Sequence, residues 1–235
     1  MIKFFRKIRQ NLLSEGKVGK YLKYALGEIL LVVLGILIAV QINNWNVNKQ
    51  NEKKEKLYLT RLTTNLGYDI RLYELIMAQD SLLIDTLSEV KDNLTQFIKT
   101  IDQPSEDLSF LITGYKFTSN RTVIDNLISS GQIELLRSNY LVEDIFLYYR
   151  TTELIETGID ATIPANNNAT VNNIILKFNS NNKIDSSYIK TIENSIHYRI
   201  DLIERQLKWY SSQKQLAEKL VKKINQEIQY IETIY

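Results

Sequence analysis

The sequence contains no cysteine, one histidine, two prolines and eight glycines among its 235 residues. Without cysteine the chain cannot form a disulfide, a thiolate zinc site or a cysteine nucleophile. The single histidine, His197, excludes any site that needs two imidazoles. Prolines and glycines are too few for the many tight turns of an all-β sandwich or barrel, and this favours a helical fold. Because 44% of the residues are hydrophobic, the chain can still build a core.

Sequence signatures of catalysis are also missing. The chain has no Walker A motif, dinucleotide-binding glycine motif, nucleophile elbow or H-E-x-x-H zinc motif. Carboxylates occur in pairs, such as Glu153 with Glu156, that are typical of solvated helix faces rather than of metal sites. His197 lies one residue off an apolar stripe, where a surface or boundary imidazole is expected. We therefore predict no enzyme activity, no catalytic or metal-binding residue and no cofactor.

The longest apolar run, ALGEILLVVLGILIAVQI, extends from Ala25 to Ile42. As a helix it measures about 27 Å, which with its flanks is enough to cross a bilayer core of roughly 30 Å. Tyr21, Tyr24 and Trp45 stand at its two ends, where aromatic rings prefer the membrane interface. A buried core helix and a cleaved signal peptide are the alternatives, although no small-x-small cleavage site follows the run. We predict a transmembrane helix over residues 24–45 that acts as a signal anchor.

Basic residues are concentrated before this run. Residues 1–23 contain seven Lys and Arg against one acid, whereas four Lys interleaved with two Glu follow the run up to residue 56. The positive-inside rule then places residues 1–23 in the cytoplasm and a domain of residues 46–235 in the periplasm of a bacterial inner-membrane protein. A short basic N-terminal segment followed by a mildly acidic sequence is unlike a nucleic-acid-binding protein, whose positive charge spreads along a binding face, so we expect no nucleic-acid partner.

The first fourteen residues have the pattern of a helix that lies in the membrane surface. Apolar residues fall on one side of this helix. We expect the basic side chains of Lys3, Arg6, Lys7 and Arg9 to lie over anionic headgroups, with Trp45 at the opposite membrane interface. A disordered basic tail is the alternative.

One face of the predicted transmembrane helix combines a carboxylate with small residues. It consists of Glu28, Leu31, Gly35, Ala39 and Ile42. A small-x-x-x-small pair lets two helices approach closely, and a membrane carboxylate usually faces protein or water. We predict that this face packs against a second helix. In the alternative, Glu28 lies near the cytoplasmic edge and turns towards Lys23 or Lys20.

Residues 1–46 contain three motifs that resemble those of a known protein family. FFRKIR, KYLKYALGEI and QINNWN resemble the N-terminal signature of an uncharacterised family of single-span membrane proteins, widespread in Bacteroidota and classed as a domain of unknown function. The resemblance continues more loosely through LISSGQIELLRSNYL, and Val47 departs from the acidic residue expected after NNWN. It implies an inner-membrane setting, and it offers no activity or catalytic residue.

Beyond Trp45 two long stretches repeat apolar residues at spacings of three and four, which predicts amphipathic helices. The first stripe is Leu59, Leu62, Leu66, Ile70, Tyr73, Met77, Asp80, Ile84, Leu87, Lys91, Leu94 and Ile98. The second is Ile189, Ile192, Ile196, Ile200, Ile203, Leu207, Tyr210, Lys214, Ala217, Val221, Ile224, Ile228 and Ile231. Nothing between Trp45 and Leu57 would break a helix, so the transmembrane helix can continue into the first stripe, which ends before Pro104.

Between the stripes we expect three short helices, within residues 107–115, 120–131 and 138–158. Asn120 and Ser138 are the predicted N-caps, and Gly131 and Gly158 the predicted stops. Residues 164–183 are rich in asparagine and predict an irregular loop with one helical turn at 174–178. The predicted fold is therefore all-α: an amphipathic helix, a transmembrane helix and a periplasmic antiparallel bundle with two long helices.

These patterns favour a protein that binds other proteins, either as an accessory or assembly subunit of a membrane complex or as a homo-oligomer. The alternative is a periplasmic ligand sensor that signals through a partner membrane protein, because the cytoplasmic segment is too short for an output domain. Aromatic residues could line the pocket of such a sensor, but at helical spacing they are more often core. They are Tyr140, Phe146, Tyr148, Tyr149, Trp209 and Tyr210.

Overall fold

The computed structural model describes residues 18–180 and 186–234, and these contain helices and no β-strand. They form two units, one ending at Lys54 and the other beginning at Glu55. The boundary falls inside helix α2 (Val18–Asp92), so the predicted continuation of the apolar helix into the first stripe is confirmed at the level of secondary structure. The predicted helix over residues 1–14 lies outside the described residues.

The first unit carries the apolar run. Its most apolar stretch has a mean hydropathy of 2.5, and none of that stretch is buried. Leu31, Leu34 and Ile38 each leave more than half of their side-chain surface exposed. In water such a surface is costly, whereas in a bilayer it costs nothing. By length and composition this helix is compatible with a single-pass membrane protein.

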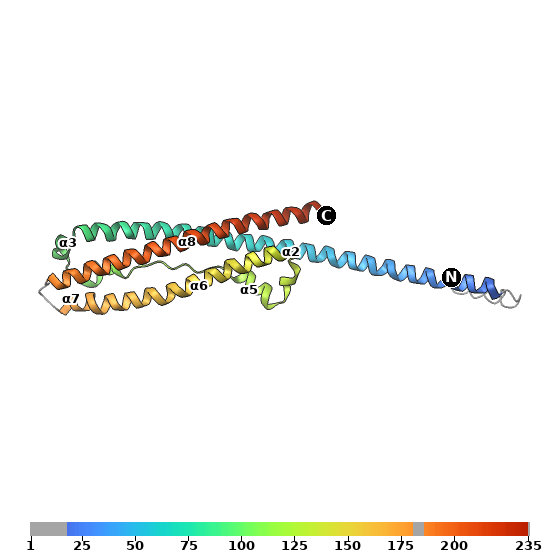
Figure 1. The fold of residues 1–235 in the computed structure, drawn as a ribbon, viewed down its shortest axis with the longest axis horizontal. Helices are drawn as coiled ribbons and strands as arrows, with labels where there is room; N and C mark the ends of the chain where they lie inside the picture. The colour runs from blue at the N-terminus through green and yellow to red at the C-terminus, as the bar shows by residue number, and fades with distance from the viewer. Residues whose placement is uncertain (1–17, 181–185, 235) are drawn as a thin grey trace. The chain divides into compact units, whose positions relative to one another are not determined.

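In the second unit, the later part of α2 lies beside α6 (Asn139–Thr170) and α8 (Ser186–Ile234) (Figure 1). Lys214 Nζ lies 2.9 Å from Glu74 Oε1, and further along α2 Asp80 Oδ2 accepts a hydrogen bond from Gln206. Residue numbers rise on α2 while they fall on α8, so these two helices are antiparallel.

Helix α6 runs in the same direction as α2. Tyr148 donates a 2.8 Å hydrogen bond to Asp69, and Thr152 bonds to Gln213 of α8. Nearer the start of α6, Asp144 pairs with Lys223, which lies later in α8. Helix α8 is therefore antiparallel to α6 as well as to α2.

The buried residues of α2 and α8 follow a seven-residue repeat, the spacing of long helices that pack along each other. On α2 they form the sets Leu59, Leu66, Tyr73, Asp80, Leu87 and Leu62, Asp69, Ile76, Leu83. On α8 they form the sets Ile196, Ile203, Tyr210, Ala217, Ile224 and Arg199, Gln206, Gln213, Leu220. The predicted stripes contain the first set on each helix but miss most of the second. Instead of the second set, the predicted stripes include half-buried residues on the opposite side of the first set, such as Ile70 and Leu207.

Short elements connect α2 to α6. They are α3 (Leu94–Thr100), α4 (Pro104–Asp107), η1 (Ser109–Leu111), α5 (Thr122–Ser129) and η2 (Gln132–Leu135). Gly131 has a φ of 69°, a left-handed conformation that suits glycine, and it ends the α5 turn as predicted. Ser138 caps α6 as predicted, because its Oγ accepts the Leu141 N–H at 3.4 Å. At α5 the prediction of Asn120 as the N-cap is wrong, because Arg121 occupies the cap position; Asn120 Oδ1 accepts from the Thr122 N–H and hydroxyl.

Two predictions in this region are wrong. Gly158 does not end a helix, and residues 164–180 of the asparagine-rich stretch are helical rather than a loop, because α6 continues to Thr170 with Pro164 inside it. A π-helical turn, η3 (Val171–Ile175), and α7 (Leu176–Ser180) follow. Ile159, Ile174 and Ile175 are buried there. Burial of these side chains outweighs the weak helix propensity of asparagine and glycine.

Candidate functional site

The face predicted to pack in the membrane lies on the apolar part of α2. Leu31 is 70% exposed and Ile42 62% exposed, and a Cβ added at Gly35 would meet nothing within 4 Å. Glu28 is half-buried and lines a shallow hollow, whose other residues are Ala25, Ile29, Val32 and Val33. The small residues at Gly35 and Ala39 are thus open to a neighbouring helix, and the packing itself stays a prediction.

Of the residues predicted for the membrane surface, only Trp45 is described. Its indole is 63% exposed, and Lys49 Nζ lies 5.7 Å from the ring centroid, within the range of a cation–π contact. Lys3, Arg6, Lys7 and Arg9 lie outside the described residues.

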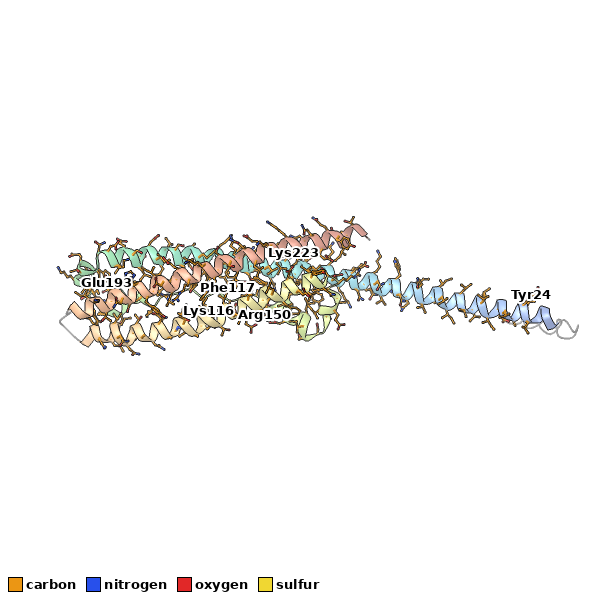
Figure 2. The ribbon with its side chains drawn as sticks, viewed as in Figure 1. Tyr24, Lys116, Phe117, Arg150, Glu193 and Lys223 are labelled. Atoms are coloured by element: carbon orange, nitrogen blue, oxygen red, sulfur yellow. The ribbon has the colours of Figure 1, made fainter. Side chains whose placement is uncertain are left out.

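The second unit holds a buried polar system that the sequence patterns do not reveal. Residues 113–120, here called the strap, have no helical or sheet structure. In Figure 1 they are drawn as a thin trace between α6 and α8, and Figure 2 labels two of them, Lys116 and Phe117. Phe117 and Ser119 of the strap are buried, and a chain without regular structure must satisfy the N–H and C=O groups that it turns towards the core by other means. Here side chains of the three long helices do so.

Helix α8 supplies three of these partners. Arg199 donates from Nη2 to the Thr113 carbonyl. Gln206 Nε2 donates to the Tyr115 carbonyl at 2.9 Å, and the Phe117 N–H donates to the Tyr210 hydroxyl at 3.2 Å. Arg199 is 2% exposed, and a Cβ at Gly114 would stand 2.5 Å from its Nη2. Only a glycine at 114 therefore leaves room for the guanidinium in this position.

Helices α2 and α6 hold the other end of the strap. The Asn120 N–H donates to Asp69 Oδ1 at 2.9 Å. The Asn120 carbonyl accepts from Asn65 Nδ2 at 3.2 Å and from the Tyr149 hydroxyl at 3.3 Å. The Ser119 N–H donates to Glu156 of α6 at 2.7 Å. The strap is thus tied to all three long helices.

Aromatic rings fill the space around the middle of the strap. Phe117 stacks on Tyr73 with ring centroids 3.8 Å apart and planes 8° apart, and Tyr210 lies 5.5 Å from Tyr73. Of the six aromatic residues weighed as a pocket, Tyr148, Tyr149 and Tyr210 belong to the core. The other three, Tyr140, Phe146 and Trp209, are exposed on the surface.

Burial shifts the acidity of the carboxyl groups in this system. It raises the pKa of Asp80 to about 7, although the nearby Arg199 guanidinium opposes the shift. It also raises the pKa of Asp69, against the hydrogen bonds from Asn120 and Tyr148. The pKa of Tyr210 rises to about 12 for the same reason. With a pKa of about 7, Asp80 changes its protonation state near neutral pH.

The geometry of these groups indicates a role in holding the fold. The polar atoms described above face the strap backbone or one another, and Asp69 and Asp80 accept bonds within the unit. Within residues 18–180 and 186–234, no group of three or more His, Asp or Glu side chains is arranged to hold a metal ion. His197 is exposed, in agreement with its surface interpretation.

A comparison with known proteins identifies the family but no activity. No curated protein and no solved structure matches the chain. A family model, described as a family of unknown function (DUF6090), matches residues 28–201, about three quarters of the sequence. The match includes most of the apolar run, the first long stripe, the strap and the whole of α6. The chain therefore belongs to the family of unknown function DUF6090.

Proposed function

We propose that this chain is a non-enzymatic, single-pass inner-membrane protein with a periplasmic helical interaction domain. It acts as an accessory or assembly subunit of a membrane complex, or as a homo-oligomer. The observation that carries the proposal is the exposed apolar helix of 2.5 mean hydropathy, joined to a helical unit whose buried polar groups hold its own strap.

Affinity purification of the full chain from detergent-solubilised membranes tests this function. The expected result is either a stoichiometric partner protein or a mass in solution that corresponds to more than one copy. A single copy with no partner would overturn the interaction role. A metabolite that copurifies with the single copy would instead support the ligand-sensor alternative.

The orientation has its own test, because it depends on the seven-to-four excess of bases before the span. Fusion of alkaline phosphatase at Tyr235 should give an active enzyme, and fusion of unmodified green fluorescent protein should stay dark. The reverse pattern would move residues 46–235 to the cytoplasm.

The membrane face can be tested by substitution. Gly35→Ile adds a branched side chain where two backbones would approach, and it should weaken association; Leu34→Ile, off this face, is the matched control. Glu28→Gln should keep the contact if a hydrogen bond matters and lose it if a charge pair does. Equal crosslinking yields for Gly35→Ile and the wild-type chain would mean that the face contacts lipid.

A further inference from the structure

Asp80 of α2 shares its partners with the strap. The carboxyl group is 1% exposed, and its Oδ2 accepts a 2.9 Å hydrogen bond from Gln206 Nε2. The same nitrogen donates to the Tyr115 carbonyl, also at 2.9 Å. The positive charge that favours an ionised Asp80 is that of Arg199, which donates to the Thr113 carbonyl. The two side chains that hold the first half of the strap are therefore also those that stabilise a carboxylate at position 80.

Gln206 and Arg199 stand on one face of α8. They are seven residues apart, which is about two helical turns, and they are 5% and 2% exposed. Arg199 Nη2 bonds to the strap, whereas Arg199 Nε is buried and has no hydrogen-bond partner among the residues that the structure describes. The guanidinium therefore has a further donor for a carboxylate.

The charge on Asp80 decides which acceptor these donors prefer. Opposite a neutral carboxyl group, Gln206 and Arg199 hold the strap carbonyls. An ionised carboxylate accepts hydrogen bonds that are about twice as strong as those to a neutral group. Because Asp80 is buried away from water, its ionised form must be stabilised by these side chains rather than by solvent. Ionisation therefore sets Asp80 in competition with the strap for the same two donors.

The second half of the strap has other partners. Its backbone N–H groups donate to side chains other than Gln206 and Arg199: Phe117 to Tyr210, Ser119 to Glu156 and Asn120 to Asp69. A change at Asp80 therefore acts on residues 113–116, and the bonds at residues 117–120 remain.

We propose that Asp80 is a pH-sensitive switch for the first half of the strap. Ionisation draws Gln206 and Arg199 towards the carboxylate and weakens their bonds to the carbonyls of Thr113 and Tyr115, so that residues 113–116 loosen. Protonation returns both donors to the strap. Because burial raises the pKa of Asp80 to about 7, the change falls near neutral pH. The switch lies within the helical unit, so it does not depend on the proposed membrane role.

Several other charged or titratable groups surround Asp80. They are Arg199 and Tyr210 on α8, Lys116 on the strap, and Glu156 and Asp160 on α6. Burial raises the pKa of Tyr210 to about 12, so this hydroxyl stays neutral. Lys116 and Asp160 pair with each other at 2.5 Å. His197 of α8 is exposed and lies two residues from Arg199, about 200° around the helix. A variant at position 80 leaves all of these groups in place, so it separates their titration from that of Asp80.

Spin labels can follow the strap because the chain has no cysteine of its own. Thr113→Cys and Tyr115→Cys each place one nitroxide in the first half, and Thr118→Cys places one in the second half, all at exposed positions. Electron paramagnetic resonance spectra of the full chain in detergent are recorded from about pH 5.5 to about pH 8.5. Across this range the ionised fraction of a group with a pKa of about 7 rises from about 3% to about 97%. The lines from positions 113 and 115 should narrow with a midpoint near neutral pH, and those from position 118 should not.

Asp80→Asn is the matched control. Its amide keeps an acceptor oxygen for Gln206 but carries no charge at any pH. In this background the labels at positions 113 and 115 should give the same broad lines across the whole range. Circular dichroism checks that each labelled chain is helical, and either label is sufficient if the other disturbs the fold.

Three results would overturn the proposal. Spectra from positions 113 and 115 that do not change with pH would show that the strap does not respond to Asp80. An equal change at position 118 would mean that the whole unit loosens rather than the first half of the strap. A change that persists in the Asp80→Asn chain would assign the titration to another group, such as His197.

Discussion

Replacement of Gly114 by alanine tests whether the strap depends on the buried Arg199. The new Cβ would stand 2.5 Å from Arg199 Nη2, so the guanidinium must shift, and we expect this shift to weaken its hydrogen bond to the Thr113 carbonyl. A hydrogen bond from a charged donor contributes about 1.5–3 kcal/mol. Alanine returns about 0.4–1 kcal/mol by restricting the unfolded chain. We expect a net loss of about 1–2 kcal/mol in the free energy of unfolding.

Gly158→Ala is the matched control. Gly158 lies inside α6, and a Cβ there meets nothing within 4 Å. Alanine in a helix interior should therefore stabilise the protein by about 0.5–1 kcal/mol, the opposite sign for the same chemical change. Urea unfolding of the full chain in detergent, followed by circular dichroism, measures both variants.

A double-mutant cycle assigns the effect to the guanidinium. In an Arg199→Met chain there is no Nη2 to displace, so Gly114→Ala should lose most of its cost. The reasoning is refuted if Gly114→Ala is as stable as the wild-type protein. It is also refuted if the cost is the same with Met at 199, since the strain would then come from the backbone.

Three further predictions concern the same unit. The pKa of Asp80 rises from 3.8 to about 7 on folding, so the carboxyl group makes the wild-type protein less stable as pH rises from about 4 to about 7. The loss is up to about 4 kcal/mol, at 1.36 kcal/mol per pKa unit. Asp80→Asn should lack this fall in stability, and parallel curves of stability against pH for the two chains would contradict the prediction. Tyr210→Phe leaves the buried Phe117 N–H unpaired and should lower the free energy of unfolding by about 1–3 kcal/mol. Trp209→Phe, at a side chain 45% exposed, should lower it little. Equal losses of stability in urea unfolding would argue against the hydrogen bond between Tyr210 and the strap. A fragment that begins at Asn51 should be soluble, strongly helical by circular dichroism and indifferent to chelator; a disordered spectrum, or loss of helix with chelator, would show that its core needs the membrane or a metal.

Hydrophobic periodicity predicts the two long helices because their first buried sets are almost entirely apolar. It fails for the second sets because Asp69, Arg199, Gln206 and Gln213 are polar, and a polar residue at helical spacing is ordinarily assigned to the surface. The strap backbone supplies bonding partners for Asp69, Arg199 and Gln206, whereas Gln213 accepts from Thr151 and Thr152 of α6. No local pattern in residues 113–120 predicts that an irregular segment packs along the long helices and buries Phe117 and Ser119.

The prediction of a loop in the asparagine-rich stretch fails for a related reason. Local propensity favours a loop at residues 164–183, but Thr170, Ile174 and Ile175 are buried, and the energy of that burial comes from residues distant in sequence. The prediction of the apolar helix is the reverse case. Its signal is contained in a single run of residues, so composition alone identifies it.

The strap has a consequence for the order in which the protein matures. Its bonds to Arg199, Gln206 and Tyr210 join residues 86, 91 and 93 positions apart, and contacts this distant in sequence form slowly. Until α8 has been synthesised, the buried residues of α2 and α6 are not covered by it, and the carbonyls of Thr113 and Tyr115 remain bonded to water. A chain that stops before Arg199 should therefore be trapped as a hydrophobic, protease-sensitive intermediate. Completion of the last helix is then the step that commits the protein to its native state.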